Sequence, residues 1–228
     1  MSVPAFRPQF RFFIRSRSAL VAGLLIVAAA LAADAAQADP RAEIMKFAVM
    51  RNGTEIGTNI INVARTGSET AVQIVTHVYV GMAFLTLYKF DQTESERWAN
   101  GHLLAMNSIT DDNGDIHRTT ASNQGGELIV QGDGQTRKAA PTILPASLWN
   151  QALLTQNTAL DPQDGTIVPV SVTDRGEDNL VVDGHAEHAH HYGLKTKFAQ
   201  DVWYDDRHRL VRVELTGADG STILYEPI

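Results

Sequence analysis

The stretch MKFAVMRNGTEIGTNIINV, residues 45–63, shows the pattern that decides the fold. Met45, Phe47 and Val49 alternate with polar or small side chains, which is the period of a β-strand with one buried face. Asn52-Gly53 follows directly, and both central positions of a tight hairpin turn require a positive φ angle that these residues adopt readily. Apolar positions then resume beyond the turn. The stretch therefore predicts an antiparallel β-hairpin.

The same pattern continues outward from this hairpin to the end of the chain. Alternating segments recur at 72–80, 103–109 and 211–215, and further hairpin turns are predicted at Asn100-Gly101 and Asn113-Gly114. Many short strands separated by turn residues are typical of an all-β domain. The fold class predicted is mainly β, a single antiparallel β-roll, half-barrel or barrel. The pattern does not decide between an open roll and a closed barrel.

Two segments depart from simple alternation. Residues 147–154, SLWNQALL, follow Pro145 and are the one stretch whose apolar spacing predicts a helix. Residues 84–90 carry apolar side chains on both faces of a strand. Such a run predicts a strand buried on both faces. It leads into the polar-faced segment 93–98.

The first 38 residues have the three parts of a secretory signal peptide. Arginines at 7, 11, 15 and 17 precede an uncharged run over 19–33, and Ala36-Gln37-Ala38 fits a cleavage site. A membrane span needs about 20 apolar residues, more than this run supplies. We therefore expect cleavage after Ala38, which leaves one β-rich domain over 39–228. That domain is expected to be periplasmic or secreted, with no membrane span.

Charge and cysteine content exclude several classes of protein. Four of the 19 basic residues and one of the 26 acidic residues lie in the first 38, so residues 39–228 hold 15 and 25, a net charge of −10. Such a charge repels phosphate backbones, and we expect no nucleic-acid partner. The chain has no cysteine. Disulfides, thiol catalysis and thiolate metal sites are therefore excluded.

Five segments carry a resemblance to known proteins: YKFDQTESERW (88–98), SLWNQALL (147–154), LDPQDG (160–165), VWYDDRHRLVRVEL (202–215) and DGSTILYE (219–226). In this order they resemble a family of exported bacterial proteins of unknown function. The Trp-Tyr-Asp turn followed by Arg209-Leu210-Val211 is also similar to a larger group of uncharacterised periplasmic proteins built as a curled antiparallel sheet. The resemblance implies a β-roll and a role in the cell envelope. It supplies no activity and no catalytic residue.

Histidines gather in His185-Ala-Glu-His188-Ala-His190-His191. On a strand, His188 and His190 would point to one face and could chelate Zn²⁺ or Cu²⁺. A firm site needs a third ligand, which would have to come from elsewhere, for example from His77 or His117. The alternative is a solvated hairpin edge. We keep metal binding by His188 and His190 as the minor hypothesis.

Acidic clusters have simpler interpretations. Residues 111–115, DDNGD, lack the glutamate that a calcium loop needs at its twelfth position, where Ser122 stands, so they predict a hairpin turn. Glu94 and Glu96 share one face of a strand, and we expect that face to be exposed to solvent. No G-x-S-x-G or phosphate-binding loop occurs. We therefore expect no catalysis and no cofactor.

Three tryptophans remain as candidates for ligand contact: Trp98, Trp149 and Trp203. They could line an apolar cleft in a curled sheet, or they could pack its core. The leading hypothesis is a non-enzymatic periplasmic binding or carrier module for a hydrophobic small molecule or lipid. The alternative is an envelope structural or interaction protein with a filled core, and a His-rich metal-binding protein comes third.

Overall fold

A computed structural model describes residues 41–82, 85–182 and 184–228, which belong to one compact unit, Gln37–Ile228. The predicted signal peptide lies outside the described residues. The elements of this part are, in order, β1 (Arg41–Arg51), β2 (Thr54–Thr66), β3 (Glu69–Met82), β4 (Leu85–Ala99), β5 (His102–Asp112), β6 (Asp115–Gln124), β7 (Glu127–Gly132), β8 (Gln135–Ala139), β9 (Leu144–Pro145), the 3₁₀-helix η1 (Gln151–Thr155), β10 (Thr158–Leu160), β11 (Ile167–Pro169), β12 (Ser171–Val182), β13 (His185–Lys195), β14 (Ala199–Asp205), β15 (Leu210–Thr216) and β16 (Thr222–Pro227).

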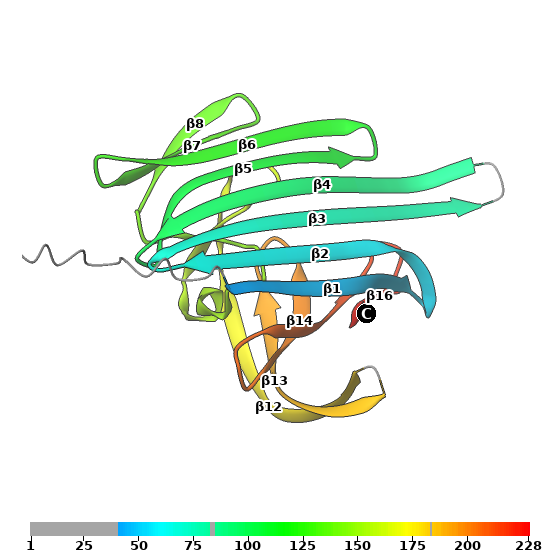
Figure 1. Ribbon diagram of the computed structural model, residues 1–228. Coiled ribbons are helices and arrows are strands. Elements are labelled where there is room, and N and C mark those ends of the chain that lie inside the picture. Colours follow the sequence, from blue (N-terminus) through cyan, green and yellow to red (C-terminus); the bar gives the residue numbers. More distant parts are fainter. Residues whose placement is uncertain (1–40, 83–84, 183) are drawn as a thin grey trace, which may run out of the picture. The chain divides into compact units, whose positions relative to one another are not determined.

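Thirteen of these strands form one antiparallel sheet in the order β12-β13-β14-β15-β16-β1-β2-β3-β4-β5-β6-β7-β8. The chain's last strand therefore pairs with β1, and the two halves of the sequence extend to either side of that pair (Figure 1). Among the described residues, β8 and β12 each pair with a single neighbour in this sheet, so the sheet is open. The predicted mainly β fold is confirmed, as an open sheet rather than a closed barrel. β9, β10 and β11 make a second, three-stranded sheet.

The predicted hairpin turns are confirmed by their backbone angles. Asn52 and Gly53 have φ of 49° and 80°, Asn100 and Gly101 have 51° and 75°, and Asn113 and Gly114 have 56° and 101°. Positive φ at both central positions is the property that Asn-Gly supplies at least steric cost. These turns fix the register of the β1–β2, β4–β5 and β5–β6 hairpins. Local sequence chemistry therefore determines much of the sheet.

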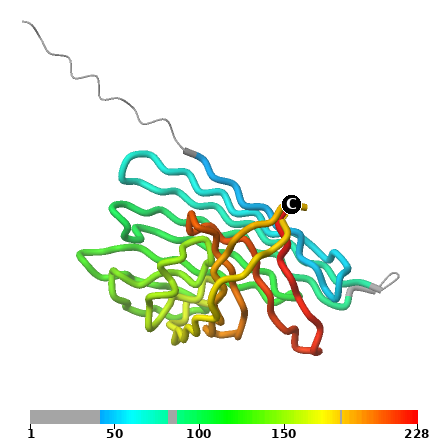
Figure 2. The backbone as a smooth tube through the Cα atoms, turned by 90° about the horizontal axis from the view of Figure 1, so that it is seen from below, coloured from blue at the N-terminus to red at the C-terminus, as the bar shows by residue number. Residues whose placement is uncertain are grey.

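The backbone of the sheet curls round on itself (Figure 2). Its buried apolar side chains form one main cluster. Phe47 is 1% exposed, and the largest fully buried apolar side chains include Leu103, Met106 and Leu128. A smaller cluster holds Leu180, Ala189, Trp203 and Val211. Because side chains alternate along a strand, Trp203 and its neighbours Val202 and Tyr204 lie on opposite faces of β14. In the described part of the chain, no helix is long and apolar enough to cross a membrane.

The helix predicted over 147–154 is shorter and of another type. The structure has a 3₁₀-helix at Gln151–Thr155, capped by Asn150, whose side chain accepts a hydrogen bond from the Ala152 N–H group. Between β9, which pairs with β10, and this helix, the chain makes a bend at Ala146 and a turn at residues 148–149. Ser147 and Trp149 donate hydrogen bonds to Glu96, which fixes this part of the chain against β4.

The prediction that 84–90 is buried on both faces is wrong for the residues described. Leu87 is 50% exposed and Tyr88 is 38% exposed, while Phe84 lies outside the described residues. The β3–β4 hairpin extends beyond its neighbours (Figure 1). Pairing of β4 with β5 begins at Phe90, and pairing of β3 with β2 stops at Val78. The end of the hairpin therefore has no adjacent strand to cover it.

Candidate functional site

Two glutamates lie inside the sheet on β4. Glu94 and Glu96 are each 1% exposed, so the prediction that they face solvent is wrong. Their direct neighbours across the strands are buried: Ile74 and Ser108 flank Glu94, and Val72 and Met106 flank Glu96. Burying an ionisable carboxyl group is costly unless it is hydrogen-bonded. The buried carboxyl pair therefore marks a candidate functional site.

Glu96 is the centre of a buried hydrogen-bond network. Its Oε2 atom accepts the indole N–H of Trp98 at 2.7 Å and that of Trp149 at 2.9 Å. Its Oε1 atom accepts the hydroxyl of Ser147. The two indole rings meet edge to face, with centroids 5.7 Å apart. One carboxyl group on β4 thus holds the segment that leads into η1.

Burial raises the pKa of both Glu94 and Glu96, but to different extents. Burial raises the pKa of Glu94 well above its usual value, and the charge of Glu96 adds to this. Burial also raises the pKa of Glu96, but hydrogen bonds from Glu94, Ser147 and the two indoles oppose that effect. Glu94 therefore holds a proton more tightly than Glu96 does, and the two carboxyl groups are hydrogen-bonded to each other. Two buried polar atoms at this place, Glu94 Oε1 and Ser108 Oγ, have no hydrogen-bond partner within the described part of the chain.

Segments far apart in the sequence meet at this network. Glu94, Glu96 and Trp98 come from 88–98, and Ser147 and Trp149 come from 147–154. Tyr204, in 202–215, donates its hydroxyl hydrogen to the Leu148 carbonyl oxygen at 2.9 Å. Three of the five segments on which the sequence resemblance rests therefore converge on one place in the fold.

A groove lies beside this network, with a volume of about 660 Å³. Apolar side chains form part of its wall: Met45, Trp149, Leu154, Val172 and Tyr192. Charged and polar side chains lie along the rest of it, among them Glu43, Arg65, Arg207, His208 and Arg209. Trp149 belongs to both places, since it lines the groove and donates its indole N–H to Glu96.

We call the part of the groove wall that carries Arg65, Arg207 and Arg209 its rim. Asp205 holds the turn that contains Arg207 and Arg209. Its Oδ1 atom accepts the backbone N–H groups of Arg207 at 2.9 Å and Arg209 at 2.8 Å, and its Oδ2 atom accepts Arg209 Nε at 2.7 Å. Asp205 is 5% exposed. The predicted turn after Trp203-Tyr204 is confirmed, and this carboxylate explains the aspartate in the Trp-Tyr-Asp pattern.

Two of the three arginines on the rim are paired with acidic side chains, and the third is not. Arg65 forms an ion pair with Glu43 at 2.8 Å, and Arg209 pairs with Asp205. Within the described part of the chain, the Arg207 guanidinium has no ion-pair partner, and the residue is exposed. Arg207 is therefore the cation of the groove that is available to an external anion.

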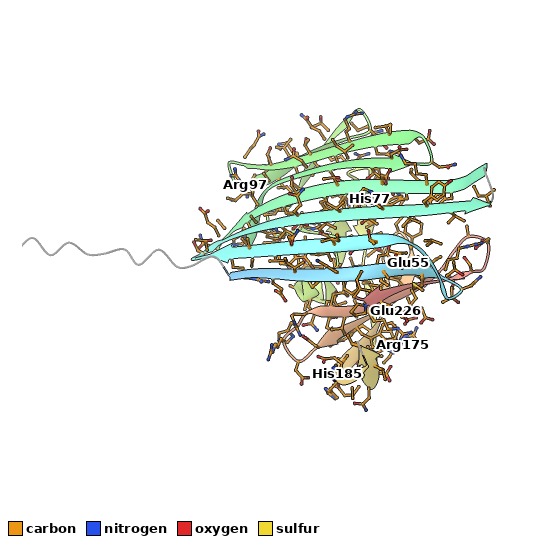
Figure 3. All side chains as sticks on the ribbon, turned by 45° about the vertical axis from the view of Figure 1, so that its right-hand side comes forward. Glu55, His77, Arg97, Arg175, His185 and Glu226 are labelled. Atoms are coloured by element: carbon orange, nitrogen blue, oxygen red, sulfur yellow. The ribbon has the colours of Figure 1, made fainter. Side chains whose placement is uncertain are left out.

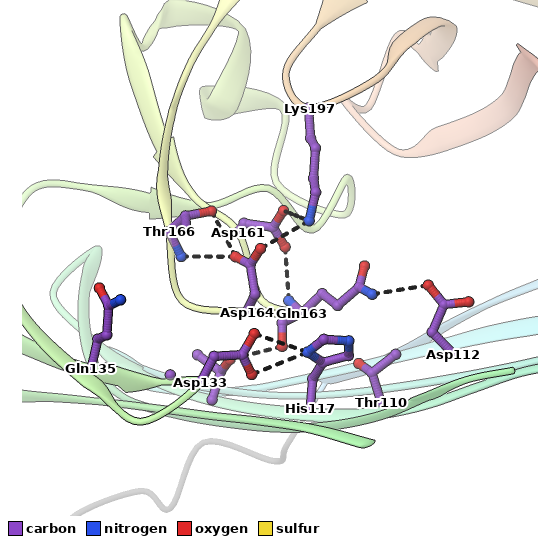
Figure 4. Close-up of polar contacts among 12 residues, drawn as sticks. Thr110, Asp112, His117, Asp133, Gln135, Asp161, Gln163, Asp164, Thr166 and Lys197 are labelled. Carbon is purple, nitrogen blue, oxygen red and sulfur yellow. Dashed lines mark hydrogen bonds and ion pairs between the residues drawn. The ribbon is translucent and has the colours of Figure 1, made fainter. Parts of the chain in front are cut away.

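The LDPQDG segment forms a separate polar cluster (Figure 4). Asp161 accepts the Gln163 N–H group at 2.8 Å, and Asp164 accepts the Thr166 N–H group at 2.9 Å. Lys197 Nζ lies 2.9 Å from Asp164 and 3.4 Å from Asp161. Partial burial of Asp164 is outweighed by the hydrogen bonds from Thr166 and Lys197, which lower its pKa to about 2. These acids are engaged in holding their own loop and Lys197.

The three candidate tryptophans do not line one cleft. Trp98 and Trp149 meet at Glu96, with exposures of 4% and 9%. Trp203 lies in the smaller cluster, where its ring stacks on His191 at a centroid distance of 4.1 Å and its Nε1 donates to Asp178. Trp149 alone lines the groove. A role of these residues in ligand binding stays a prediction.

The histidine cluster lies at the surface of β13. His188 and His190 share a face, as the period of a strand requires, and both approach Glu177 of β12, at 3.3 Å and 2.6 Å. His190 also contacts Asp174 at 2.7 Å, and His188 contacts Asp206 at 3.1 Å. Their imidazoles are thus occupied by carboxylates.

The structure does not bring His77 or His117 to this cluster. His77 pairs with Asp91 and His117 with Asp133, on strands β3 and β6. His77 lies on a different part of the sheet from His185 and Arg175, which mark β13 and β12 (Figure 3). Across the three described ranges, no group of three or more His, Asp or Glu side chains is placed to hold a metal ion. Metal binding by His188 and His190 stays a prediction.

Sequence reasoning missed the carboxyl network, although one signal was present. Glu94, Glu96 and Trp98 occupy alternate positions of one strand, so all three face the same way. A tryptophan is seldom fully exposed, which marks its face as the inner one. Ser147 and Trp149 had no such signal, since their contacts with Glu96 span 51 and 53 residues of sequence.

The sheet, curled and open with a buried polar network inside, defines a β-barrel-like class of protein. A search of solved structures found a β-barrel-like protein of a domain of unknown function, DUF1849, from Brucella abortus, with 10% sequence identity and a TM-score of 0.56. The match covers 84% of this chain and 97% of that one, and at this identity it shows the fold alone.

Residues 47–228 match the family described as a domain of unknown function, DUF6134, and the chain belongs to this family. The predicted resemblance to a family of unknown function with distant β-roll relatives is confirmed. A search of curated proteins gave no match.

Proposed function

We propose that this protein is a non-enzymatic binding or carrier module for a hydrophobic small molecule or lipid that bears one anionic group. The observation that carries the proposal is the groove, whose apolar wall adjoins a rim with an uncompensated arginine, Arg207. The apolar part of the ligand would lie against Trp149 and Leu154. Its anionic group would reach the guanidinium of Arg207.

The size and chemistry of the groove support this proposal. Sites for small ligands have volumes of about 300–1,000 Å³, are mostly apolar and contain a few polar groups that orient the ligand. The groove, at about 660 Å³, falls within that range. An arginine at the end of an apolar wall recognises carboxylate or phosphate through parallel N–H donors.

The distribution of charge also favours a local anion site. The domain over 39–228 has a net charge of −10, yet three arginines gather on this one rim: Arg65, Arg207 and Arg209. The rim is thus a basic exception on an acidic protein. Together with the signal-peptide pattern of residues 1–38, this supports action on an amphiphile in the periplasm or outside the cell.

The test uses three probes with the same alkyl chain: dodecanoate, dodecanol and dodecyltrimethylammonium. Titration calorimetry of the purified protein should show dodecanoate binding more tightly than the other two. Arg207→Ala should weaken dodecanoate binding about tenfold, as expected for loss of a charge-assisted hydrogen bond. Lys138→Ala is the matched control, because Lys138 is exposed on β8 and does not line the groove.

Two results would overturn the proposal. One is that none of the probes binds. The other is that the cationic probe binds as tightly as dodecanoate, or that Arg207→Ala and Lys138→Ala have equal effects. Either outcome would remove the role assigned to the rim.

A second candidate is an envelope interaction protein with a filled core. It is favoured by exposed apolar side chains on neighbouring strands, namely Leu87 on β4, Ile109 on β5 and Ile116 on β6, with exposures of 50%, 53% and 49%. Exposed apolar patches often mark protein contacts. A photo-reactive residue at Ile109 that gives a defined cross-link in cells, together with no binding of the three probes, would select this candidate.

A further inference from the structure

We infer that the Glu94–Glu96 pair is a proton-operated latch on residues 146–155, the segment that forms one wall of the groove. With a proton on Glu94 the segment is held against β4, and when that proton passes to solvent the segment is released. The inference rests on the proposed function in one respect: the wall that moves belongs to the proposed binding site. The latch itself acts without a ligand.

Two side chains of the segment tie it to the sheet through Glu96. Ser147 and Trp149 both donate to this carboxylate, and they stand at the start of the path into η1. Other contacts also hold the segment. The Tyr204 hydroxyl donates to the Leu148 carbonyl oxygen, and the Ala146 N–H group donates to the Leu160 carbonyl oxygen. Leu153 is 0% exposed. A change at Glu96 therefore acts directly on the segment.

The segment is also a large part of the groove. Six of the fourteen residues that line the groove come from 149–155. Trp149 is the link, because its ring lines the groove while its indole N–H bonds Glu96. Movement of the segment would change the wall that a ligand contacts.

Among the residues that the structure describes, no cation pairs with either carboxyl group of the pair. Facing Glu94 from β3 and β5 are Ile74 and Ser108, and facing Glu96 are Val72 and Met106. The segment contributes Ser147, and the loop between β10 and β11 contributes Asp161, whose charge acts against ionisation of Glu94. Lys197 approaches this region but pairs with Asp161 and Asp164.

Loss of the Glu94 proton has two consequences for the latch. Two carboxylates then lie side by side in a buried site, where like charges repel strongly. Glu96 also loses the donor that Glu94 provided. Water can reach the pair once residues 146–155 move away, so release of this segment relieves both costs. The unpartnered Glu94 Oε1 and Ser108 Oγ are places where entering water could bind.

The absence of cysteine makes this movement measurable. A single thiol can be placed at Leu153, which is buried, or at Ala152, which is exposed in the same 3₁₀-helix. Labelling of each variant by iodoacetamide is followed from about pH 5 to about pH 9. The ratio of the Leu153→Cys rate to the Ala152→Cys rate cancels the intrinsic pH dependence of the thiol.

We expect this ratio to rise at least about tenfold with pH in the otherwise unchanged chain. Glu94→Gln, whose amide can donate to Glu96 at every pH, should hold the rise to less than about twofold. His208→Gln should keep the full rise, although His208 also lines the groove. A flat ratio in the parent chain, or an equal rise with Glu94→Gln, would overturn the latch.

A second measurement needs no change in the segment itself. Acrylamide quenching of tryptophan emission should increase with pH in the unmodified protein and not in Glu94→Gln, because Trp98 and Trp149 become accessible. Equal quenching in both proteins would contradict the latch. Both measurements are made without ligand, so their failure would be separate from failure of the three alkyl probes to bind.

Discussion

Two strands of this sheet carry the same pattern of titratable residues in opposite surroundings. β4 has Glu94 and Glu96, and β13 has His188 and His190, each a like pair separated by one residue. In both cases the period of the strand places the pair on one face. On β4 that face is the inside of the sheet, and on β13 it is open to solvent.

The difference determines what each pair can do. The glutamates are surrounded by neutral donors, from Ser147 and two indoles, and burial raises the pKa of both. The histidines are surrounded by carboxylates and water. Breaking a buried charged network is costly, whereas exposed ion pairs contribute little. The spacing of two ionisable residues therefore says less about chemistry than the face of the strand on which they lie.

The largest expected effect is at Glu96. Glu96→Ala leaves three buried donors without an acceptor, and it should lower the free energy of unfolding by about 3–5 kcal/mol. Urea unfolding measures this change. Glu127→Ala is the control, since Glu127 lies exposed on β7 and pairs only with Lys138. If the two variants lower the free energy of unfolding by amounts within about 1 kcal/mol of each other, the buried acid contributes no more to stability than the exposed one.

A smaller effect is expected at the turn that forms the rim. Asp205→Ala removes the acceptor of two backbone N–H groups and of Arg209, and it should cost about 2–3 kcal/mol by urea unfolding. The adjacent Asp206→Ala should change stability by less than about 0.5 kcal/mol, because the Asp206 side chain is 80% exposed. Equal losses at the two positions would mean that the buried acceptor does not hold the turn.

The pH dependence of stability sharpens the comparison further. The pKa of Glu94 is raised in the folded protein, so the folded state binds this proton more tightly than the unfolded state. The free energy of unfolding should therefore decrease as pH rises above the unfolded value, near 4.5, toward the folded pKa. The slope from one such group reaches about 1.4 kcal/mol per pH unit.

Glu94→Gln should remove this slope, and Glu69→Gln, at an exposed end of β3, should leave it unchanged. Urea unfolding at several pH values compares the three proteins. A wild-type stability that increases with pH over this interval would show that Glu94 is ionised inside the folded protein.

Much of the fold could be predicted because its signals are local. Asn-Gly pairs and alternation predicted hairpins such as β1–β2 and β5–β6, and their positive φ angles bear this out. Whether the sheet closes depends on β8 and β12, which are remote in sequence, and no local pattern reports on their pairing. The type of helix at 151–155 also depended on distant contacts, those of Ser147 and Trp149 with Glu96.

The candidate site was less predictable for the same reason. Four histidines within residues 185–191 suggested a metal site, but their spacing in the sequence does not indicate whether they are buried. The glutamates were assigned to the surface because charged side chains are usually found there. Trp98, two positions after Glu96 on the same face of the strand, indicated instead that this face is buried. The groove could not be predicted, since its wall combines β1, η1 and the β14–β15 turn.

The smallest expected effect is at the histidines. The hydrogen bond that His190 donates to Asp174 raises the pKa of His190, against slight desolvation, and Glu177 adds to the rise. The resulting stability is present below the unfolded pKa, near 6.5, and is lost as pH rises through the folded value. Because Asp174 and Glu177 are exposed, solvent limits the contribution to less than about 1 kcal/mol.

His188→Gln combined with His190→Gln should therefore lower stability slightly at about pH 5.5, by less in high salt, and leave it unchanged at about pH 9. The same variant tests the metal hypothesis, since a zinc-induced rise in melting temperature that only the parent protein shows would restore it. That result would require the carboxylates that hold the imidazoles to join them as ligands. The exposed pair would then be the site of specific chemistry, and the contrast with β4 would be reversed.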